Sequence, residues 1–312
     1  MAESELIMTR QQIRERIRLR QSSIKDFMLC GRLFQYRHLD GIEAKSRSAK
    51  TLNGSALHRL LYDLHNGDWD MDVETAYPKA FAHYEFDSDE SHIPVRFLKD
   101  RESDLKAFTA TAVEIVDGYR RRPENELSTM LFQEVQFRVK ILSESYEGTI
   151  DGLRRLPDGK IELFDFKSNA IKPNVHAVAA DIQLNLYTYA AMYGEFKVGD
   201  DWIKPRIKAD YSSIYYLPNH RIRKRSSPNG QKGEEFGYPL IRTSKSIEDL
   251  RAFRKEVSNI LKSMLKPWYF KNNSTACVFC QYTDLCQSQN PVVTDRAASK
   301  ANEMLAELGM QN

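Results

Sequence analysis

The chain has 312 residues and a mass of 36.2 kDa, which suits one large domain or a core domain with additions. Apolar residues make up 41% and charged residues 29%, so a sizeable core can form and disorder throughout the chain is excluded. The net charge is only +3, so the overall charge does not indicate a nucleic-acid partner. Four cysteines are too few for a small disulfide scaffold.

The sequence contains no signal for a membrane or for secretion. The first 20 residues are acidic and then strongly basic, without the apolar stretch of a secretory leader. No apolar run approaches the roughly 20 residues that cross a bilayer. We therefore expect a cytoplasmic protein with no membrane partner, in a reducing compartment where clustered thiols more often bind metal than form disulfides.

Helical patterns dominate the first 120 residues. A helix is expected from about Ile24, with an apolar face that includes Phe27 and Leu33, and a second from about residue 52 to 64. Residues 66–100 are locally acidic and predict loops. A long helix over 101–120 is expected to end before Pro123, because the residue before a proline avoids the helical conformation.

Strand patterns follow. The turn sequence Pro157-Asp158-Gly159 joins two strand-like runs and predicts a β-hairpin. The order of strands and helices favours the α/β (α+β) class, with a mixed central sheet flanked by helices. The predicted strands are 132–139, 146–153, 161–167 and 211–217. A helix over 176–193 is predicted between the last two strands, and another over 246–265 follows them.

The hairpin brings two carboxylates together. If its turn is centred on Asp158, Asp151 faces Asp165 across the ladder, and Lys167 shares that face. Like charges placed opposite each other are destabilising, and a divalent cation such as Mg²⁺ or Mn²⁺ would compensate them. The alternative is a solvated strand face on which Lys167 pairs with Asp165. The apolar neighbours of both carboxylates favour a buried site, where charges need partners.

The segment GTIDGLRRLPDGKIELFDFKS, residues 148–168, resembles the core of the PD-(D/E)XK nuclease superfamily, and within it the RecB-like branch. The resemblance implies a restriction-endonuclease-like core with a helical insertion, in which Asp151, Asp165 and Lys167 are catalytic. It also implies that a Mg²⁺ or Mn²⁺ ion is held by His58, Asp151, Asp165 and the backbone carbonyl of Phe166. The proline of the superfamily name is absent here, as in many members of this branch.

Four further residues match this branch. His58 in NGSALHRLL matches its helical histidine, and Glu134 in QEVQF matches a strand glutamate that supports the site. Gln183 and Tyr187 in QLNLY match its Gln-x-x-x-Tyr element, and their i, i+4 spacing puts both on one helix face for contact with DNA. Taken singly, each also fits a core histidine or an ordinary amphipathic helix, so the resemblance depends on the ordered set.

Three cysteines lie close together at Cys277, Cys280 and Cys286, and only Cys30 remains as a fourth ligand. Thiolates at this spacing suit either Zn²⁺ or an iron–sulfur cluster. The resemblance to AddB-type and CRISPR-associated relatives implies a structural [4Fe–4S] cluster that staples the Cys-rich C-terminal segment to the N-terminal helix. Gly31 stands where those relatives usually have proline after the first cysteine.

Two local patches are basic enough to bind phosphate, although each also fits a solvated surface. Tyr215 and Tyr216 precede the second patch, where they either stack on unpaired bases or pack in the core. The first patch comprises Arg10, Arg14, Arg16, Arg18 and Arg20, and the second comprises Arg221, Arg223, Lys224, Arg225 and Lys232.

These observations predict a metal-dependent DNA nuclease, an exonuclease that prefers single strands and acts in DNA repair, recombination or the processing of ends. The alternatives are a non-catalytic DNA-binding or assembly module and, with no support from the residues, a redox sensor. Because the sequence lacks a GxxxxGK[ST] phosphate loop, a helicase or recombination partner is expected. The expected organisation is a basic segment over 1–20, one nuclease domain over 21–290 and a tail over 291–312. Within the domain we expect a helical insertion at about 60–130, a catalytic core at about 131–217 and an iron–sulfur segment at 277–286.

Overall fold

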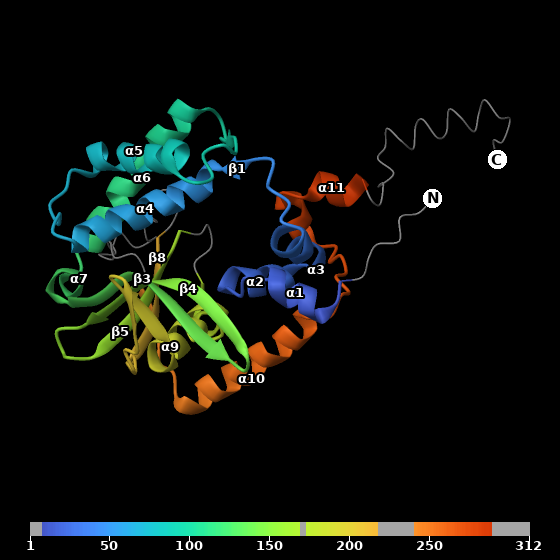
Figure 1. The fold of residues 1–312 in the computed structure, drawn as a ribbon. Coiled ribbons are helices and arrows are strands. Elements are labelled where there is room, and N and C mark those ends of the chain that lie inside the picture. Colours follow the sequence, from blue (N-terminus) through green and yellow to red (C-terminus); the bar gives the residue numbers. More distant parts are fainter. Residues whose placement is uncertain (1–7, 169–172, 218–239, 289–312) are drawn as a thin grey trace, which may run out of the picture.

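A computed structural model describes residues 8–168, 173–217 and 240–288 (Figure 1). Its centre is a seven-stranded mixed sheet in the order β7-β6-β3-β4-β5-β8-β9, in which β5 and β8 pair in parallel and the other described neighbours pair antiparallel. The predicted mixed sheet flanked by helices is therefore confirmed. Its strands are β3 Thr129–Ile141, β4 Glu144–Arg155, β5 Ile161–Lys167, β6 Glu195–Val198, β7 Asp201–Ile203, β8 Tyr211–Tyr216 and β9 Leu240–Thr243.

Three helices cover one face of the sheet, namely α4 Ala49–His65, α5 Val73–Ala82 and α6 Arg101–Arg120 (Figure 1). Their apolar sides bury Phe164 and Phe166 of β5 together with Tyr215 of β8. The short helix α7 Pro123–Leu127 then leads into β3. A two-residue parallel pair, β1 Arg47–Ser48 with β2 Val95–Arg96, lies at the start of α4.

The stretch over residues 66–100, predicted to be rich in loops, also contains α5 and a π-helical turn over His83–Asp87, which were not predicted individually. Val73, Tyr77 and Phe81 recur at four-residue spacing and bury one face of α5. Pro78 inside the helix and the acidic residues around it obscured this pattern.

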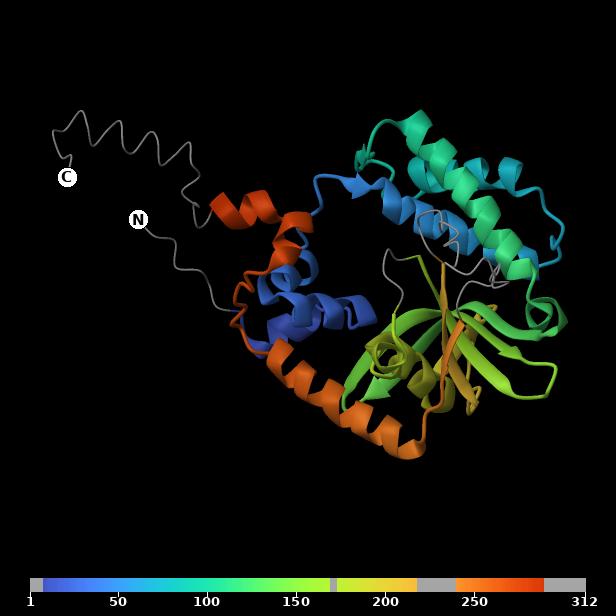
Figure 2. The same ribbon diagram turned by 180° about the vertical axis from the view of Figure 1, so that it is seen from behind.

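The opposite face of the sheet packs against α9 Ile182–Tyr193 and α10 Ile247–Met264, and α2 Gln21–Leu29 joins the same core (Figure 2). Ser246 caps α10, in agreement with the predicted helix over 246–265. The single helix predicted over 176–193 is instead α8 Val175–Ala179 followed by α9. The helical conformation is interrupted between them because Asp181 caps α9. Its Oδ1 accepts the Leu184 N–H at 2.9 Å.

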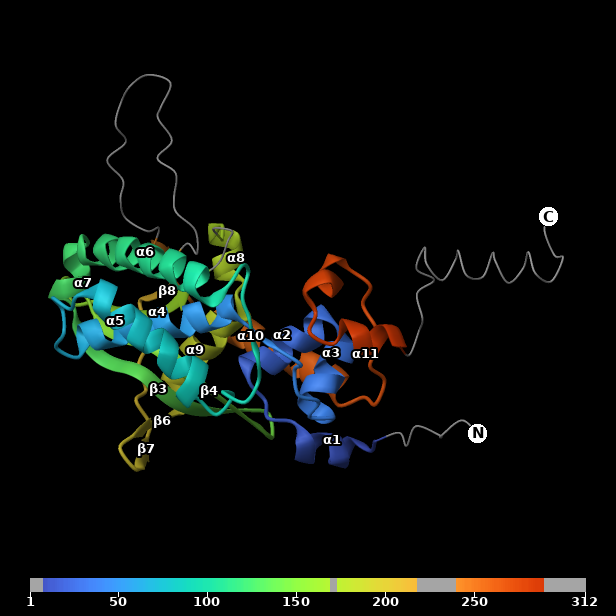
Figure 3. The same cartoon turned by 90° about the horizontal axis from the view of Figure 1, so that it is seen from above.

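The N-terminal helices α1 Arg10–Arg16, α2 and α3 Gly31–Phe34 lie beside the last described segment of the chain (Figure 3). A π-helical turn over Gln35–Leu39 follows α3, while the C-terminal segment holds a 3-10 turn over Thr275–Phe279 and α11 Thr283–Ser288. The Tyr282 hydroxyl donates to the carbonyl of Ile42 at 2.7 Å, and Asn272 Nδ2 donates to that of Leu29 at 2.8 Å. Among the described helices, none is long and apolar enough to cross a membrane.

The β4–β5 hairpin has the predicted register. Gly152 pairs with Phe164, Leu153 with Leu163 and Arg154 with Glu162, so the numbers of paired residues sum to 316. A Cβ atom on Gly152 would lie 2.0 Å from the Phe164 ring, so glycine is required where this ring crosses the neighbouring strand.

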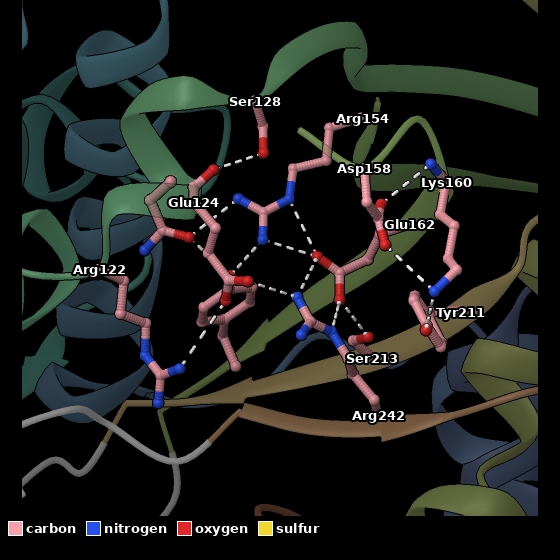
Figure 4. Close-up of polar contacts among 12 residues, drawn as sticks. Arg122, Glu124, Ser128, Arg154, Asp158, Lys160, Glu162, Tyr211, Ser213 and Arg242 are labelled. Atoms are coloured by element: carbon pink, nitrogen blue, oxygen red, sulfur yellow. Dashed lines mark hydrogen bonds and ion pairs between the residues drawn. The ribbon is translucent and has the colours of Figure 1, made fainter. Parts of the chain in front are cut away.

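A buried polar network occupies the face of this hairpin that α4, α5 and α6 cover (Figure 4). Arg154 and Glu162 are both fully buried, and Glu162 Oε2 accepts Arg154 Nε at 2.9 Å and Nη2 at 2.6 Å. Glu162 Oε1 accepts the Ser213 hydroxyl and Arg242 Nε, each at 2.7 Å. Burial by itself raises the pKa of Glu162, but the bond from Arg242 and the charge of Arg154 outweigh it and leave that pKa below its ordinary value.

Tyr215 belongs to this network, since its hydroxyl donates to Asn125 Oδ1 at 2.6 Å and accepts from Arg154 Nη2. Tyr215 and Tyr216 are 1% and 5% exposed. Of the two roles considered for this tyrosine pair, core packing is therefore correct, and stacking on bases is excluded.

We predict that Glu162→Gln lowers the free energy of unfolding by about 3 kcal/mol, because it removes the negative charge between two arginines, one of them fully buried. Urea denaturation at neutral pH measures the change. The matched control is Asp284→Asn, which breaks an ion pair between Asp284 and Lys45. These side chains are 80% and 78% exposed, so the control should leave stability unchanged. Equal effects of the two substitutions would contradict the role assigned to the buried network.

Candidate active site

His58, Glu134 and Asp151 converge at the edge of the sheet that faces α4. Their ligand atoms lie within 4.8 Å of one another. His58 Nδ1 is 3.5 Å from Asp151 Oδ2 and 3.9 Å from Glu134 Oε1, and its Nε2 is 3.2 Å from the carbonyl oxygen of Phe166. The histidine therefore directs one ring nitrogen at two carboxylates and the other at the backbone of β5.

Asp151 joins the two strands beyond their last paired residues. Its Oδ2 accepts the Phe166 N–H at 2.7 Å, which orients the carboxylate toward β5. Burial raises the pKa of Asp151, against the charge of His58. Burial lowers the pKa of His58, but the charge of Asp151 and the contact with Glu134 outweigh it and raise that pKa to about 9.

Asp165 lies on the same face of β5 as Lys167, and α9 supplies its other partner. Lys167 Nζ is 2.6 Å from Asp165 Oδ2 and 2.9 Å from Gln183 Oε1, while Gln183 Nε2 donates to Asp165 Oδ1 at 2.7 Å. Gln183 Nε2 also reaches the Tyr187 hydroxyl at 2.7 Å. Burial raises the pKa of Asp165 to about 6, although Lys167 acts in the opposite direction.

The donor set fits a hard divalent cation. His58, Asp151 and Asp165 line a groove, with Glu134 beside His58, and burial raises the pKa of both aspartates. Asp165 Oδ2 is buried, and the Lys167 ammonium lies 2.6 Å from it. Oxygen ligands gathered in this way suit Mg²⁺ or Mn²⁺.

Glu134 is held in an unusual backbone conformation for a strand residue, with φ of 45°. The neighbouring residues Gln133 and Val135 pair with Gly152 and Ile150, so Glu134 lies opposite the region of Asp151 without a ladder pair of its own. A left-handed φ is costly for a residue with a Cβ and is found most often at functional sites.

A groove of about 790 Å³ contains the site. Two helices direct their N-terminal residues into it, Arg20 and Ser22 from the start of α2 and Lys50 and Thr51 from the start of α4. Figure 1 shows α2 pointing toward β4 below α4. Positive helix ends and basic side chains favour an anionic ligand.

The groove also gathers residues that the sequence did not single out. Lys50, Gln136 and Trp202 line it, and Lys25 of α2 donates to Gln183 at 3.0 Å. Lys25 and Gln183 are 158 positions apart, so no local pattern could have revealed their contact. Arg20 is the one member of the first basic patch that lines the groove. The predicted DNA contacts Arg221, Arg223, Lys224 and Arg225, and Lys232 beside them, lie outside the described residues.

The four cysteines line a second cavity, of about 390 Å³. The Asn272 N–H points at Cys30 Sγ, 3.4 Å away, and Cys277 Sγ lies 3.7 Å from the carbonyl oxygen of Asn272. Among the described residues no three of these sulfurs lie within 4.8 Å of one another. Sulfurs bound to one Zn²⁺ at about 2.3 Å would lie closer, at about 3.8 Å from one another.

Comparisons with known proteins agree on the fold. The family model of the PD-(D/E)XK nuclease superfamily matches residues 18–287. A solved structure from Eubacterium rectale, named as a candidate exonuclease, is 15% identical, covers 94% of this chain and 95% of its own, and has a TM-score of 0.52. A protein named SSO0001 is 12% identical over 86% of this chain and 95% of its own, but its TM-score of 0.32 supports no argument. A search of curated proteins found no match.

We predict that Glu134→Gly raises the free energy of unfolding by about 1 kcal/mol, because glycine adopts a left-handed φ without strain. The same substitution should reduce the rise in melting temperature that Mn²⁺ produces, since it removes a carboxylate ligand. The control is Leu142→Gly, at φ of 58° on the exposed β3–β4 turn, which should stabilise without changing the Mn²⁺ response. An unchanged Mn²⁺ response in Glu134→Gly would exclude this side chain from the metal site.

Proposed function

Because the chain belongs to the PD-(D/E)XK nuclease superfamily, we propose that it is a Mg²⁺- or Mn²⁺-dependent DNA nuclease of the RecB-like branch. The observation that carries this proposal is the convergence, in one groove, of His58 and Asp151 with the Asp165–Lys167 pair, with Glu134 beside His58. A purely DNA-binding module has no use for buried carboxylates that lower the local positive potential.

His58, Asp151, Asp165 and the carbonyl of Phe166 would hold the cation, with Glu134 in support. Bound there, Mg²⁺ or Mn²⁺ would supply Lewis-acid activation of the phosphodiester and of the attacking water. Because the His58 pKa is raised to about 9 without a cation, this imidazole must release a proton when it becomes a ligand. Cation binding should therefore weaken as the pH falls.

Lys167 acts as a fixed positive charge. Burial alone would lower its pKa, but Asp165 and Asp151 outweigh burial and raise it, so the side chain stays an ammonium at neutral pH. It is therefore suited to donate to the attacking water or to the developing negative charge on phosphate, and unsuited to accept a proton.

We propose that the substrate is single-stranded or frayed DNA, degraded from an end. Support comes from the groove, which combines the basic residues Arg20 and Lys50 with the aromatic ring of Trp202, as sites for unpaired strands do. The structural neighbour from Eubacterium rectale, named as a candidate exonuclease, points the same way. Gln183 and Tyr187, the expected DNA contacts, are 7% and 2% exposed and bond to each other. Their polar groups would therefore position Asp165 and Lys167 beside the strand.

We propose that the four-cysteine cavity holds a [4Fe–4S] cluster with a structural role. The cavity receives ligands from both ends of the described chain, and an amide N–H directed at Cys30 Sγ is the kind of contact that tunes cluster thiolates. Zn²⁺ in the same cage is the competing assignment.

We propose that the protein acts in the cytoplasm. It would consist of one nuclease domain over residues 21–290, with a basic segment before it and a tail after it. Its role would be in DNA repair, recombination or the processing of ends. A helicase or recombination partner would supply unwound strands.

The decisive measurement is cleavage of end-labelled DNA with Mg²⁺ or Mn²⁺. We predict that Lys167→Ala and Asp165→Asn each lower the cleavage rate by at least about 100-fold, because each removes a preorganised charge at the reacting phosphate. Lys255→Ala, an exposed lysine on α10, is the control and should cut like the wild type. Cleavage by Lys167→Ala at the wild-type rate would refute the assignment.

The choice of substrates separates the remaining alternatives. Linear single strands labelled at either end, duplexes and single-stranded circles distinguish an exonuclease from an endonuclease, because a circle offers no end. A wild-type protein that binds these strands without cutting any of them would support the non-catalytic binding module instead.

We predict that protein purified without oxygen is brown and contains about four iron and four sulfide atoms per chain. Cys286→Ser should lose the colour and lower the melting temperature, because the cluster joins the N-terminal and C-terminal segments. Elemental analysis and visible absorption test this. A colourless, iron-free, zinc-loaded protein with full activity would establish the zinc alternative.

A further inference from the structure

Lys25 connects the N-terminal helix α2 to the first turn of α9. Its Nζ lies 3.0 Å from Gln183 Oε1 and 3.4 Å from Asp181 Oδ2. Ile24, the preceding residue, is completely buried, and Phe27 packs edge-on against Phe34 with ring centroids 5.4 Å apart. The helix that carries Lys25 is thus anchored in the core on both sides of it.

Gln183 receives two ammonium groups on the same oxygen. Lys167 Nζ lies 2.9 Å from Gln183 Oε1, on which Lys25 also converges. A glutamine amide can rotate by half a turn with little change of shape, so its orientation depends on its partners. Two cations on one side require the oxygen there, and the NH₂ group must then face the other way.

The orientation of Gln183 determines what Asp165 can do. With the NH₂ group turned inward, Gln183 Nε2 donates to Asp165 Oδ1 and to the Tyr187 hydroxyl, each at 2.7 Å. This bond occupies Oδ1, so that Oδ2 remains for the Lys167 ammonium, 2.6 Å away, and for a cation. The reversed amide would place its oxygen against the buried carboxylate.

We propose that Lys25 is a positioning residue of the nuclease reaction, which holds the Gln183 amide so that it donates to Asp165 Oδ1 and leaves Oδ2 to Lys167 and the cation. The proposal rests on the proposed nuclease function. Lys25 does not line the groove, so it acts through Gln183 and not by contact with DNA. The separation in sequence means that the N-terminal helix is part of the catalytic arrangement, in addition to any part in the cysteine cavity.

A double-mutant cycle tests the proposal by kinetics. Lys25→Met should lower kcat by roughly tenfold with KM for DNA unchanged, since one hydrogen bond from a charged group is lost away from the substrate. In a Gln183→Met background the same substitution should change kcat by less than about twofold. Lys25→Arg keeps the charge and should retain most of the activity, and Lys255→Met is the surface control.

Three results for these variants would overturn the proposal. Additive effects of Lys25→Met and Gln183→Met would show that Lys25 acts independently of the amide. A raised KM with a weaker salt dependence would show that Lys25 binds a phosphate of the substrate. A lower melting temperature with unchanged kcat would show that it only joins α2 to α9.

Side-chain amide exchange supplies a readout that does not need catalysis. In protein with ¹⁵N-labelled glutamine, the Gln183 NH₂ signal is identified by its loss in Gln183→Met. We expect its exchange with water to be slow in the wild type and at least about tenfold faster in Lys25→Met, because the amide is then free to rotate. Unchanged exchange would refute the inference even in an active enzyme. If the wild type cuts no DNA, the nuclease proposal fails and this exchange measurement still decides whether Lys25 holds the amide.

Discussion

The burial of the Asp165 carboxylate in the central sheet is the constraint on which the site depends. Its side chain is 1% exposed, and an isolated charge in such a place would be neutralised or expelled. The chain compensates it with the ammonium of Lys167 from the same strand and the amide of Gln183 from α9. Because one partner comes from the sheet and the other from a helix, the carboxylate is stable only when α9 is docked.

The β4–β5 hairpin carries two buried charged networks, one on each face, and their difference separates a structural from a functional arrangement. On the face covered by α4, α5 and α6, both oxygens of Glu162 are hydrogen-bonded, between Arg154 and Arg242 (Figure 4). On the groove face Asp165 Oδ2 has the Lys167 ammonium as its one described partner, beside the imidazole and carboxylates of the neighbouring cluster. A complete network stabilises the sheet, whereas an incomplete one leaves room for a cation.

Prediction from the sequence succeeded where the pattern is local. The hairpin register followed from one turn sequence, and β5 was placed at its observed bounds, Ile161–Lys167, because it follows that turn directly. Prediction failed where local signals compete, as in α5, where a proline interrupts an apolar face, and at Asp181, where a cap divides one predicted helix in two. The short strands β6, β7 and β9 were missed because three or four residues carry too little periodicity.

The sequence by itself determined which residue types stand at which positions of the hairpin, and therefore that Asp151, Asp165 and Lys167 would share one face, since side chains alternate along a strand. The family resemblance named His58 and Gln183 as site residues, but only the tertiary structure decided how they meet this face and added Lys25. The three residues come from α4, α9 and α2, which pack around the same strands. Such contacts depend on the docking of whole elements, which no local spacing encodes.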